Sequence, residues 1–222
     1  MATVSAPPAV GQRLLLYNVD WQTYTRLLRI FAEHPSVRLA YDRGTLEIMS
    51  PLPEHEKDAD FLGVLVRSLT RELGLTIQGG GSMTMRRRRK QKGIEPDRCY
   101  WIANEPAVRG KRTFDPRIDP PPDLAIEVDV TSSSLNRMGI YATLGVPEVW
   151  RLDQPTLTFH ALGANRKYSA ITHSLSFPLV TPADLLNFLA LRATLDENGV
   201  LDQFETWVRQ RRAAGGAAPP TP

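Results

Sequence analysis

The chain has 222 residues, which is enough for one domain with a sizeable core. Its 42% hydrophobic and 23% charged content is ordinary for a globular protein, and no apolar run approaches the ~20 residues that a membrane-spanning helix needs. One cysteine, Cys99, excludes an intrachain disulfide and favours a reducing, cytoplasmic setting. We expect Cys99 to be a small core residue, because lone cysteines in apolar surroundings usually are.

The formal net charge of +3 conceals a local imbalance. The run MRRRRKQK, residues 85–92, carries six basic residues and no acidic one, and without it 27 basic residues fall to 21 against 24 acidic ones. Such a segment is compatible with phosphate contacts, and the alternative, which the sequence alone slightly favours, is a solvated hairpin tip. The predicted contacts to nucleic acid are Arg86, Arg87, Arg88, Arg89 and Lys90.

The first half of the chain predicts two amphipathic helices around a hairpin. Residues 1–17 lack the pattern of a signal peptide, and we expect them to form a disordered leader. Apolar residues recur at three- and four-residue steps in 18–34 and again in 54–74, where Gly74 is the expected C-cap. Between these helices, Asp42-Arg43-Gly44 separates two short apolar runs, as in a hairpin turn.

The second half predicts strands interleaved with helices. Strands 81–87 and 94–102 would form a hairpin with the basic run at its tip. The later elements are strand 123–131, helix 134–144, strand 147–153, a hairpin of 156–162 and 167–173, and helices within 181–212. This order predicts an α/β fold with a mixed sheet flanked by helices. We expect a single domain over 18–212, with its core at about 38–160 and a C-terminal helical part at 181–212, before a disordered tail at 213–222.

The strand predicted at 123–131 carries carboxylates inside an apolar run. Side chains alternate along a strand, so Glu127 and Asp129 share the face opposite the apolar one and lie ~6–7 Å apart. Burying charge without a partner is costly, so these acids either hold a cation or line one wet face of an antiparallel strand. Asp123 is ~13 Å from Glu127 on the same strand, too far to share a metal ion, and we expect it to be structural.

A second pair of acids, Glu95 and Asp97, lies on one face of the neighbouring predicted strand. Carboxylates from two adjacent strands would form a small oxygen cage of the kind that Mg²⁺ prefers. On the helix after the acidic strand, Arg137 and Tyr141 lie four residues apart and share a face. Arg137 would point a cation into the same pocket, or else it is a surface arginine.

Three stretches resemble a known family: IEPD at 94–97, PPDLAIEVDVTSSSLNRMGIYATLGVPEVWRLD at 121–153 and YDRGTLEIMSPLPEHE at 41–56. They resemble the Uma-two family of restriction endonucleases, within the PD-(D/E)XK nuclease superfamily, over about residues 38–189. The resemblance implies a restriction-endonuclease-like core of helix, three strands, helix and strand.

The resemblance also implies a site. Asp97 and Glu127 would be the metal-binding acids, with Mg²⁺ or Mn²⁺ as cofactor. The superfamily lysine is replaced by Asp129 at its usual position, and Arg137 matches the basic residue that this family places on the following helix. Arginine grips phosphate but does not readily release a proton. Glu47, with Glu54 and His55, matches the acid-and-histidine region at the front of the family's site.

The predicted function is metal-dependent hydrolysis of DNA phosphodiester bonds. The alternative is a non-catalytic module that binds nucleic acid or assembles with a partner on a nuclease fold, because the lysine is missing. A glycosidase would also use paired carboxylates, but the aromatic content is 8% and no aromatic residue lies beside Glu127 and Asp129. Many restriction-like nucleases act as dimers, so a homodimer is a further hypothesis.

Overall fold

The fold consists of two sheets stacked with helices. A computed structural model describes residues 12–34, 37–50, 52–128 and 135–215. The first sheet has the spatial order β1 (Gln12–Leu16), β3 (Thr45–Ser50), β2 (Arg38–Asp42), β6 (Lys92–Ile94) and β5 (Met85–Arg87). The second sheet has the order β11 (Tyr168–Ile171), β10 (Thr156–Leu162), β9 (Glu148–Asp153), β8 (Leu124–Val128), β7 (Arg98–Trp101) and β4 (Gln78–Gly79).

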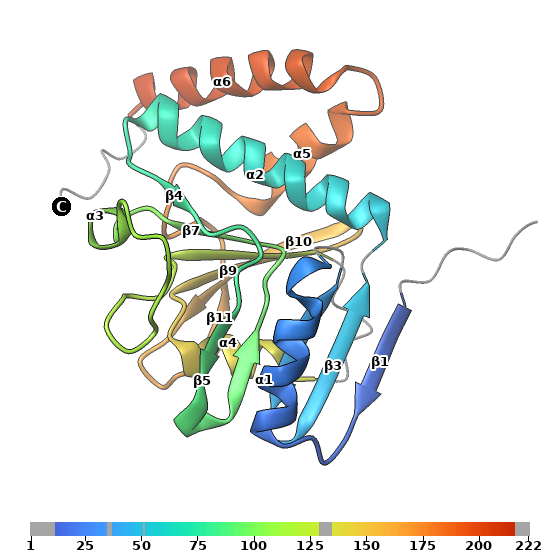
Figure 1. The fold of residues 1–222 in the computed structure, drawn as a ribbon. Helices are drawn as coiled ribbons and strands as arrows, with labels where there is room; N and C mark the ends of the chain where they lie inside the picture. The colour runs from blue at the N-terminus through green and yellow to red at the C-terminus, as the bar shows by residue number, and fades with distance from the viewer. Residues whose placement is uncertain (1–11, 35–36, 51, 129–134, 216–222) are drawn as a thin grey trace, which may run out of the picture.

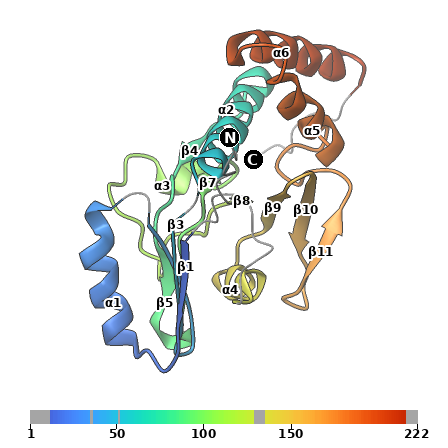
Figure 2. The same cartoon turned by 90° about the vertical axis from the view of Figure 1, so that its right-hand side faces the viewer.

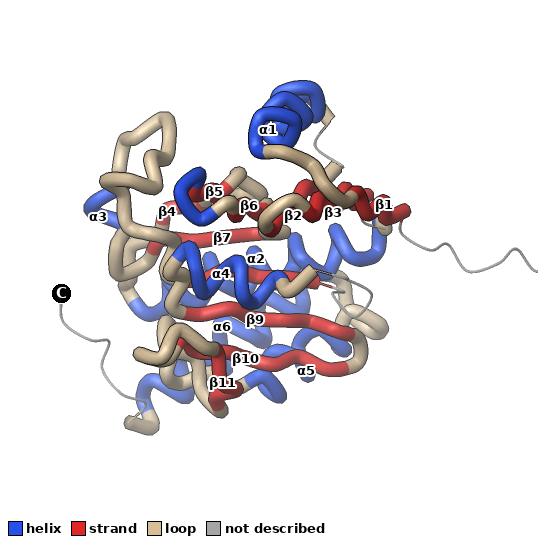
Figure 3. Tube along the Cα trace, turned by 90° about the horizontal axis from the view of Figure 1, so that it is seen from below, coloured by secondary structure: helices blue, strands red, loops and turns tan. Residues whose placement is uncertain are grey.

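Helices cover both sheets and also separate them. Helix α1 (Trp21–Ile30), followed by the 3₁₀ turn η1 (Phe31–Glu33), packs on one face of the first sheet, and α4 (Arg137–Leu144) lies between the two sheets (Figure 1; Figure 2). Helices α2 (Pro53–Leu73), α5 (Pro182–Leu191) and α6 (Glu197–Ala213) cover the far face of the second sheet (Figure 3). The remaining short helices are η2 (Arg88–Lys90) and α3 (Glu105–Val108). The mixed α/β, restriction-endonuclease-like architecture is therefore confirmed.

Helix α2 begins and ends where its sequence predicts. Pro53 occupies the first turn, where a missing N–H costs nothing, and Glu54 and Glu56 lie at the positive end of the helix dipole. Gly74 takes the left-handed conformation, with φ of 68°, and caps the helix through its N–H. The helix buries a stripe that includes Phe61, Leu62 and Leu65.

The β8–α4–β9 unit places the acidic strand inside the second sheet. Strand β8 pairs in parallel with β9 and antiparallel with β7. Leu124 and Ile126 point to the α2 side, whereas Ala125 points to α4, as alternation along the strand requires. Both faces of the strand are covered, so the alternative of one wet face is wrong for the described residues 124–128.

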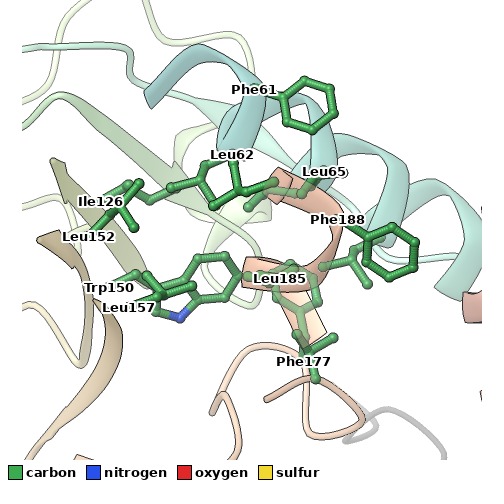
Figure 4. Close-up of a cluster of buried hydrophobic side chains, with 14 of the residues drawn as sticks. Phe61, Leu62, Leu65, Ile126, Trp150, Leu152, Leu157, Phe177, Leu185 and Phe188 are labelled. Carbon is green, nitrogen blue, oxygen red and sulfur yellow. The ribbon is translucent and has the colours of Figure 1, made fainter. Parts of the chain in front are cut away.

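The largest core cluster joins the second sheet to the helices that cover it. Figure 4 shows Leu62 and Leu65 of α2 facing Ile126 and Trp150 of the sheet. The Trp150 ring stacks on Phe159 at a centroid distance of 4.5 Å. A second cluster packs α4 against both sheets. Cys99 is fully buried and burial raises its thiol pKa to about 12, which confirms it as a core residue.

Two predictions about local structure are wrong. The strand predicted at 94–102 divides into β6 and β7, which belong to different sheets, because Pro96 lacks the N–H that a continuous ladder needs. The basic hairpin is therefore formed by β5 and β6. In addition, residues 12–16 of the predicted leader form β1, which pairs with β3. None of the helices described is long and apolar enough to cross a membrane.

Candidate active site at the junction of the two sheets

The break at Pro96 brings together three acids, two from strands and one from the crossing between the sheets. Glu47 lies on β3 of the first sheet, Glu127 lies on β8 of the second sheet, and Asp97 lies where the chain crosses between them. All three are buried, with exposed fractions of 1%, 2% and 4% respectively. Asp97 is held in place by the N–H of Val128, which donates to its Oδ2 over 2.8 Å.

Arg137, the first residue of α4, links these acids. Its Nε donates to Glu127 Oε2 at 3.1 Å, and its Nη2 lies 2.9 and 2.8 Å from the two Glu127 oxygens. Its Nη1 donates to Glu47 Oε1 at 3.2 Å, and Nη2 also approaches the Glu95 carbonyl oxygen at 3.4 Å. The guanidinium is 5% exposed, so the alternative of a surface arginine is wrong. A planar guanidinium that meets a carboxylate with two nitrogens forms one of the stronger side-chain interactions in proteins.

Tyr141 lies one helical turn further along α4 and completes the contacts of Glu127. Its hydroxyl donates to Glu127 Oε1, the oxygen that also accepts from Arg137. Burial raises the Tyr141 pKa well above its ordinary value, so the hydroxyl remains a neutral donor. The shared face of Arg137 and Tyr141 was predicted from their spacing, but the tyrosine was not assigned to the site.

The pKa shifts at this site follow from burial and from crowding of like charges. Burial raises the pKa of Asp97 to about 7, and the nearby charge of Glu127 adds to the shift. Burial also raises the pKa of Glu95. For Arg137, burial is the largest single effect and lowers the pKa, but the neighbouring groups, Glu127 foremost, together outweigh it, so the net shift is upward and the guanidinium stays charged.

Two further cations border the cluster, and the sequence interpretation missed both. Arg13 of β1 lies 3.4 Å from Glu47 Oε2. Arg38 of β2 is 5% exposed, and its Nη2 donates to Glu56 Oε1 in the first turn of α2 at 2.9 Å. The charge of Arg38 lowers the pKa of Asp97, which places it near the acids. The sequence did contain an indication for Arg38. Side chains alternate along β2, so Arg38 lies on the same face as Ala40 and on the opposite face from Leu39.

The structure brings together four of the predicted site residues: Asp97, Glu127, Glu47 and Arg137. His55 lies half-buried in the first turn of α2, and its place in the site stays a prediction. Asp129 lies outside the described residues.

The two remaining predicted acids have structural contacts. Glu95 accepts from the Leu39 N–H at 2.8 Å and from the Thr84 hydroxyl at 2.5 Å. Asp123 is structural, as expected, because it accepts from the Ile102 and Asn104 N–H groups at 2.7 and 2.9 Å.

The basic run does not form one continuous surface. Arg88, Arg89 and Lys90 are exposed in η2 at the hairpin tip. Arg86 on β5 is exposed on the α1 side, where its charge partly opposes the burial that raises the pKa of Tyr24. Arg87 is half-buried on the opposite face, where it lines a recess with Phe114 and Pro116. The tip and Arg86 are thus the accessible part of the predicted nucleic-acid contact.

Comparison with models of protein families shows to which family the chain belongs. The model of the Uma2 (Uma-two) family, described as "Putative restriction endonuclease", matches residues 21–193. The chain belongs to the Uma2 family. The match spans the first sheet apart from β1, the junction and the β8–α4–β9 unit, so the whole cluster except Arg13 falls inside it. No curated protein matches the chain.

Restriction-endonuclease-like folds generally use divalent metal ions. The question at the Uma2 junction is whether its side chains supply the ligands that such an ion prefers. Asp97 and Glu127 fit by donor type, because both supply the hard oxygens that Mg²⁺ prefers. A cation would also relieve the repulsion from Glu127, which adds to the effect of burial in raising the Asp97 pKa. Among the described residues, no group of three or more His, Cys, Asp or Glu side chains is arranged to hold a metal ion. Mg²⁺ commonly takes one or two carboxylates and completes its shell with waters and substrate phosphate, so two acids suffice.

Proposed function

We propose that this Uma2 chain is a metal-dependent nuclease that hydrolyses phosphodiester bonds of DNA, with Mg²⁺ or Mn²⁺ held by Asp97 and Glu127. The supporting observation is the convergence of acids from both sheets on one buried guanidinium within the segment matched by a restriction-endonuclease family. Buried carboxylates with perturbed pKa values cluster at catalytic sites more often than elsewhere.

Each residue of the cluster has a distinct expected role. A bound metal ion would supply Lewis acidity and an activated water at neutral pH. Asp97 is oriented for binding by the Val128 N–H, and Tyr141 orients Glu127. Arg137 would stabilise the negative charge that develops on the phosphate, since guanidinium matches phosphate geometry, but its high pKa excludes it as the general base.

The exposed basic tip supplies the expected contact to the DNA backbone. Arg88, Arg89 and Lys90 are solvent-exposed, and cations of this kind bind phosphates without reading base sequence. We therefore expect binding that depends strongly on salt concentration and weakly on DNA sequence.

Cleavage of plasmid DNA in Mg²⁺ or Mn²⁺ tests this proposal. Asp97→Ala and Glu127→Ala should each reduce cleavage by about 10²-fold or more, because each removes a metal-binding carboxylate. Glu148→Gln is the matched control: it removes the charge of a fully buried carboxylate on β9 that is bonded to Trp150 and Ser176 and not to the cluster. Circular dichroism of each variant separates loss of activity from loss of fold. Equal cleavage by wild type and both alanine variants would refute the site, and RNA substrates tested alongside DNA would identify the nucleic acid.

A second function has its own supporting observation. Both oxygens of Glu127 already accept hydrogen bonds from Arg137, which is the arrangement expected of a structural ion pair. In that case the chain is a non-catalytic module that binds nucleic acid. It would bind DNA in a salt-sensitive manner, cut nothing in Mg²⁺ or Mn²⁺, and show no metal binding by calorimetry.

A further inference from the structure

We propose that the Arg137 guanidinium occupies the cation position between Glu127 and Glu47 and competes with the divalent metal ion, so that residue 137 sets the metal affinity of the site. This inference rests on the proposed metal-dependent function and concerns a property of this chain, the arginine at the head of α4.

The Arg137 guanidinium lies against the carboxylate oxygens that a metal ion would bind. Three nitrogens of Arg137 are directed at carboxylate oxygens, with Nε and Nη2 on Glu127 and Nη1 on Glu47. Mg²⁺ binds carboxylate oxygens at about 2.0–2.1 Å and demands near-octahedral geometry. A metal ion on Glu127 would have to share these same oxygens with the guanidinium, and Tyr141 adds a further donor to Oε1. The metal ion can therefore bind Glu127 fully only when the guanidinium withdraws.

The charges in the pocket also favour one cation at a time. Arg137 neutralises charge on Glu127 and Glu47, and Glu47 also lies beside Arg13. A divalent ion placed against Glu127 while Arg137 stayed in contact would repel the guanidinium in a site that is almost closed to water, where screening is weak. Arginine cannot relieve this repulsion by losing its proton.

Arginine and lysine would act differently at position 137. Lysine carries one compact charge and cannot form the two-nitrogen fork on a carboxylate. It would leave at least one Glu127 oxygen to a metal ion while keeping a positive charge in the pocket. The residue type at position 137 would therefore determine whether the carboxylate of Glu127 is occupied by the protein's own cation or is available to a metal ion.

The test is a calorimetric titration of Mn²⁺ into the full chain, in wild-type, Arg137→Lys and Arg137→Gln forms. We expect binding tighter than wild type by about tenfold for Arg137→Lys, and by more for Arg137→Gln, since a tenfold change corresponds to about 1.4 kcal/mol. Adding Glu127→Gln to either variant should remove the gain. The thermal midpoint of the variants should rise on addition of Mn²⁺ by more than that of wild type, because a ligand stabilises the state that binds it.

Arg38→Lys is the matched control, because Arg38 is also 5% exposed and borders the same acids but bonds to Glu56. Its Mn²⁺ affinity should stay within about twofold of wild type. Arg137→Lys keeps a charge between Glu127 and Glu47 and carries the test if Arg137→Gln does not fold.

The outcomes separate this inference from the proposed function. Variants of Arg137 that bind Mn²⁺ no more tightly than wild type, in a protein that binds Mn²⁺ and cuts DNA, would overturn the competition and leave the nuclease intact. If neither the wild type nor the variants bind Mn²⁺, both the competition and the metal-dependent nuclease are rejected.

Discussion

Two charged regions of the protein differ in their exposure to solvent and in the sign of their charges. At the junction cluster (Glu47, Asp97, Glu127 and Arg137), every side chain is at most 5% exposed and each charge has a partner. At the basic tip (Arg88, Arg89 and Lys90), the side chains are exposed at the end of the β5–β6 hairpin. The first region has mixed charge in a closed setting, and the second has one sign of charge in water.

This difference indicates what each region is able to do. Buried charges interact strongly and are costly to leave unpaired, so the junction cluster is sensitive to single substitutions and suits chemistry at a defined position. Exposed charges are screened by salt within about 10 Å, so the tip contributes little to stability and suits contacts with a long polyanion. Substitutions made in one region and not in the other test this difference.

The largest effect on stability is expected for Arg137→Met. It leaves Glu127 and Glu47 buried without their shared cation, so the free energy of unfolding should fall by about 3–5 kcal/mol. Urea denaturation in the presence of a chelator measures this. Arg89→Met, which changes the same residue type at the exposed tip, should alter stability by less than about 0.5 kcal/mol. Equal losses for both substitutions would abolish the contrast between the regions.

A second effect on stability, spread over about three pH units, is expected from pH. Folding raises the Asp97 pKa from its ordinary value of 3.8 to about 7, so between those values the folded state keeps a proton that the unfolded state has lost. Stability should therefore fall as pH rises from about 4 to about 7, by at most about 1.4 kcal/mol per pH unit.

Denaturation of wild type and Asp97→Asn at several pH values in that window tests the pH dependence. The asparagine resembles the protonated carboxyl and keeps an oxygen to accept the Val128 N–H, so its curve should be flatter by the contribution of Asp97. The same slope in both proteins would show that another group is responsible.

The smallest effect on stability, with the largest on DNA binding, is expected at the tip. Replacing Arg88, Arg89 and Lys90 together by serine should leave the unfolding midpoint nearly unchanged. DNA affinity should fall at low salt, and the slope of log K against log[salt] should become shallower by up to about 0.9 per lost phosphate contact. Fluorescence anisotropy with labelled DNA at several salt concentrations measures both.

A matched triple variant of exposed arginines elsewhere controls for net charge. Arg209, Arg211 and Arg212 lie at the end of α6, on the side of the molecule away from the β5–β6 tip (Figure 1). Their replacement by serine removes the same charge from the protein. If it weakens DNA binding as much as the tip variant does, net charge and not the tip determines the affinity.

Much of the local structure follows from the sequence. The spacing of apolar residues and the helix caps predicted α2 and the β8–α4–β9 unit. The turn residues between two apolar runs predicted the β2–β3 hairpin. Alternation along residues 124–128 placed Glu127 opposite the apolar face of its strand. These features depend on neighbours within a few residues, which a sequence displays directly.

The division into two sheets was not predicted, although Pro96 was its signal. Residues 94–102 resemble one continuous strand, because apolar residues lie on both sides of the proline. The absent N–H at Pro96 instead ends one ladder, and the chain begins another in a different sheet. This change of sheet places Asp97 next to Glu127. A single strand over 94–102 would not explain why the two acids meet.

By itself, the sequence determined the type of most helices and strands, the faces of those elements, and the identity of the acids and of the arginine, because periodicity and charge are local properties. Only the tertiary structure decided that Glu47, Asp97, Glu127 and Arg137 form one buried network with Tyr141 and beside Arg13 and Arg38. These residues come from β3, the β6–β7 crossing, β8 and α4, and their distances depend on how two sheets pack around one helix. No local pattern encodes that packing, because it results from the burial of the apolar faces of α4 against both sheets at once.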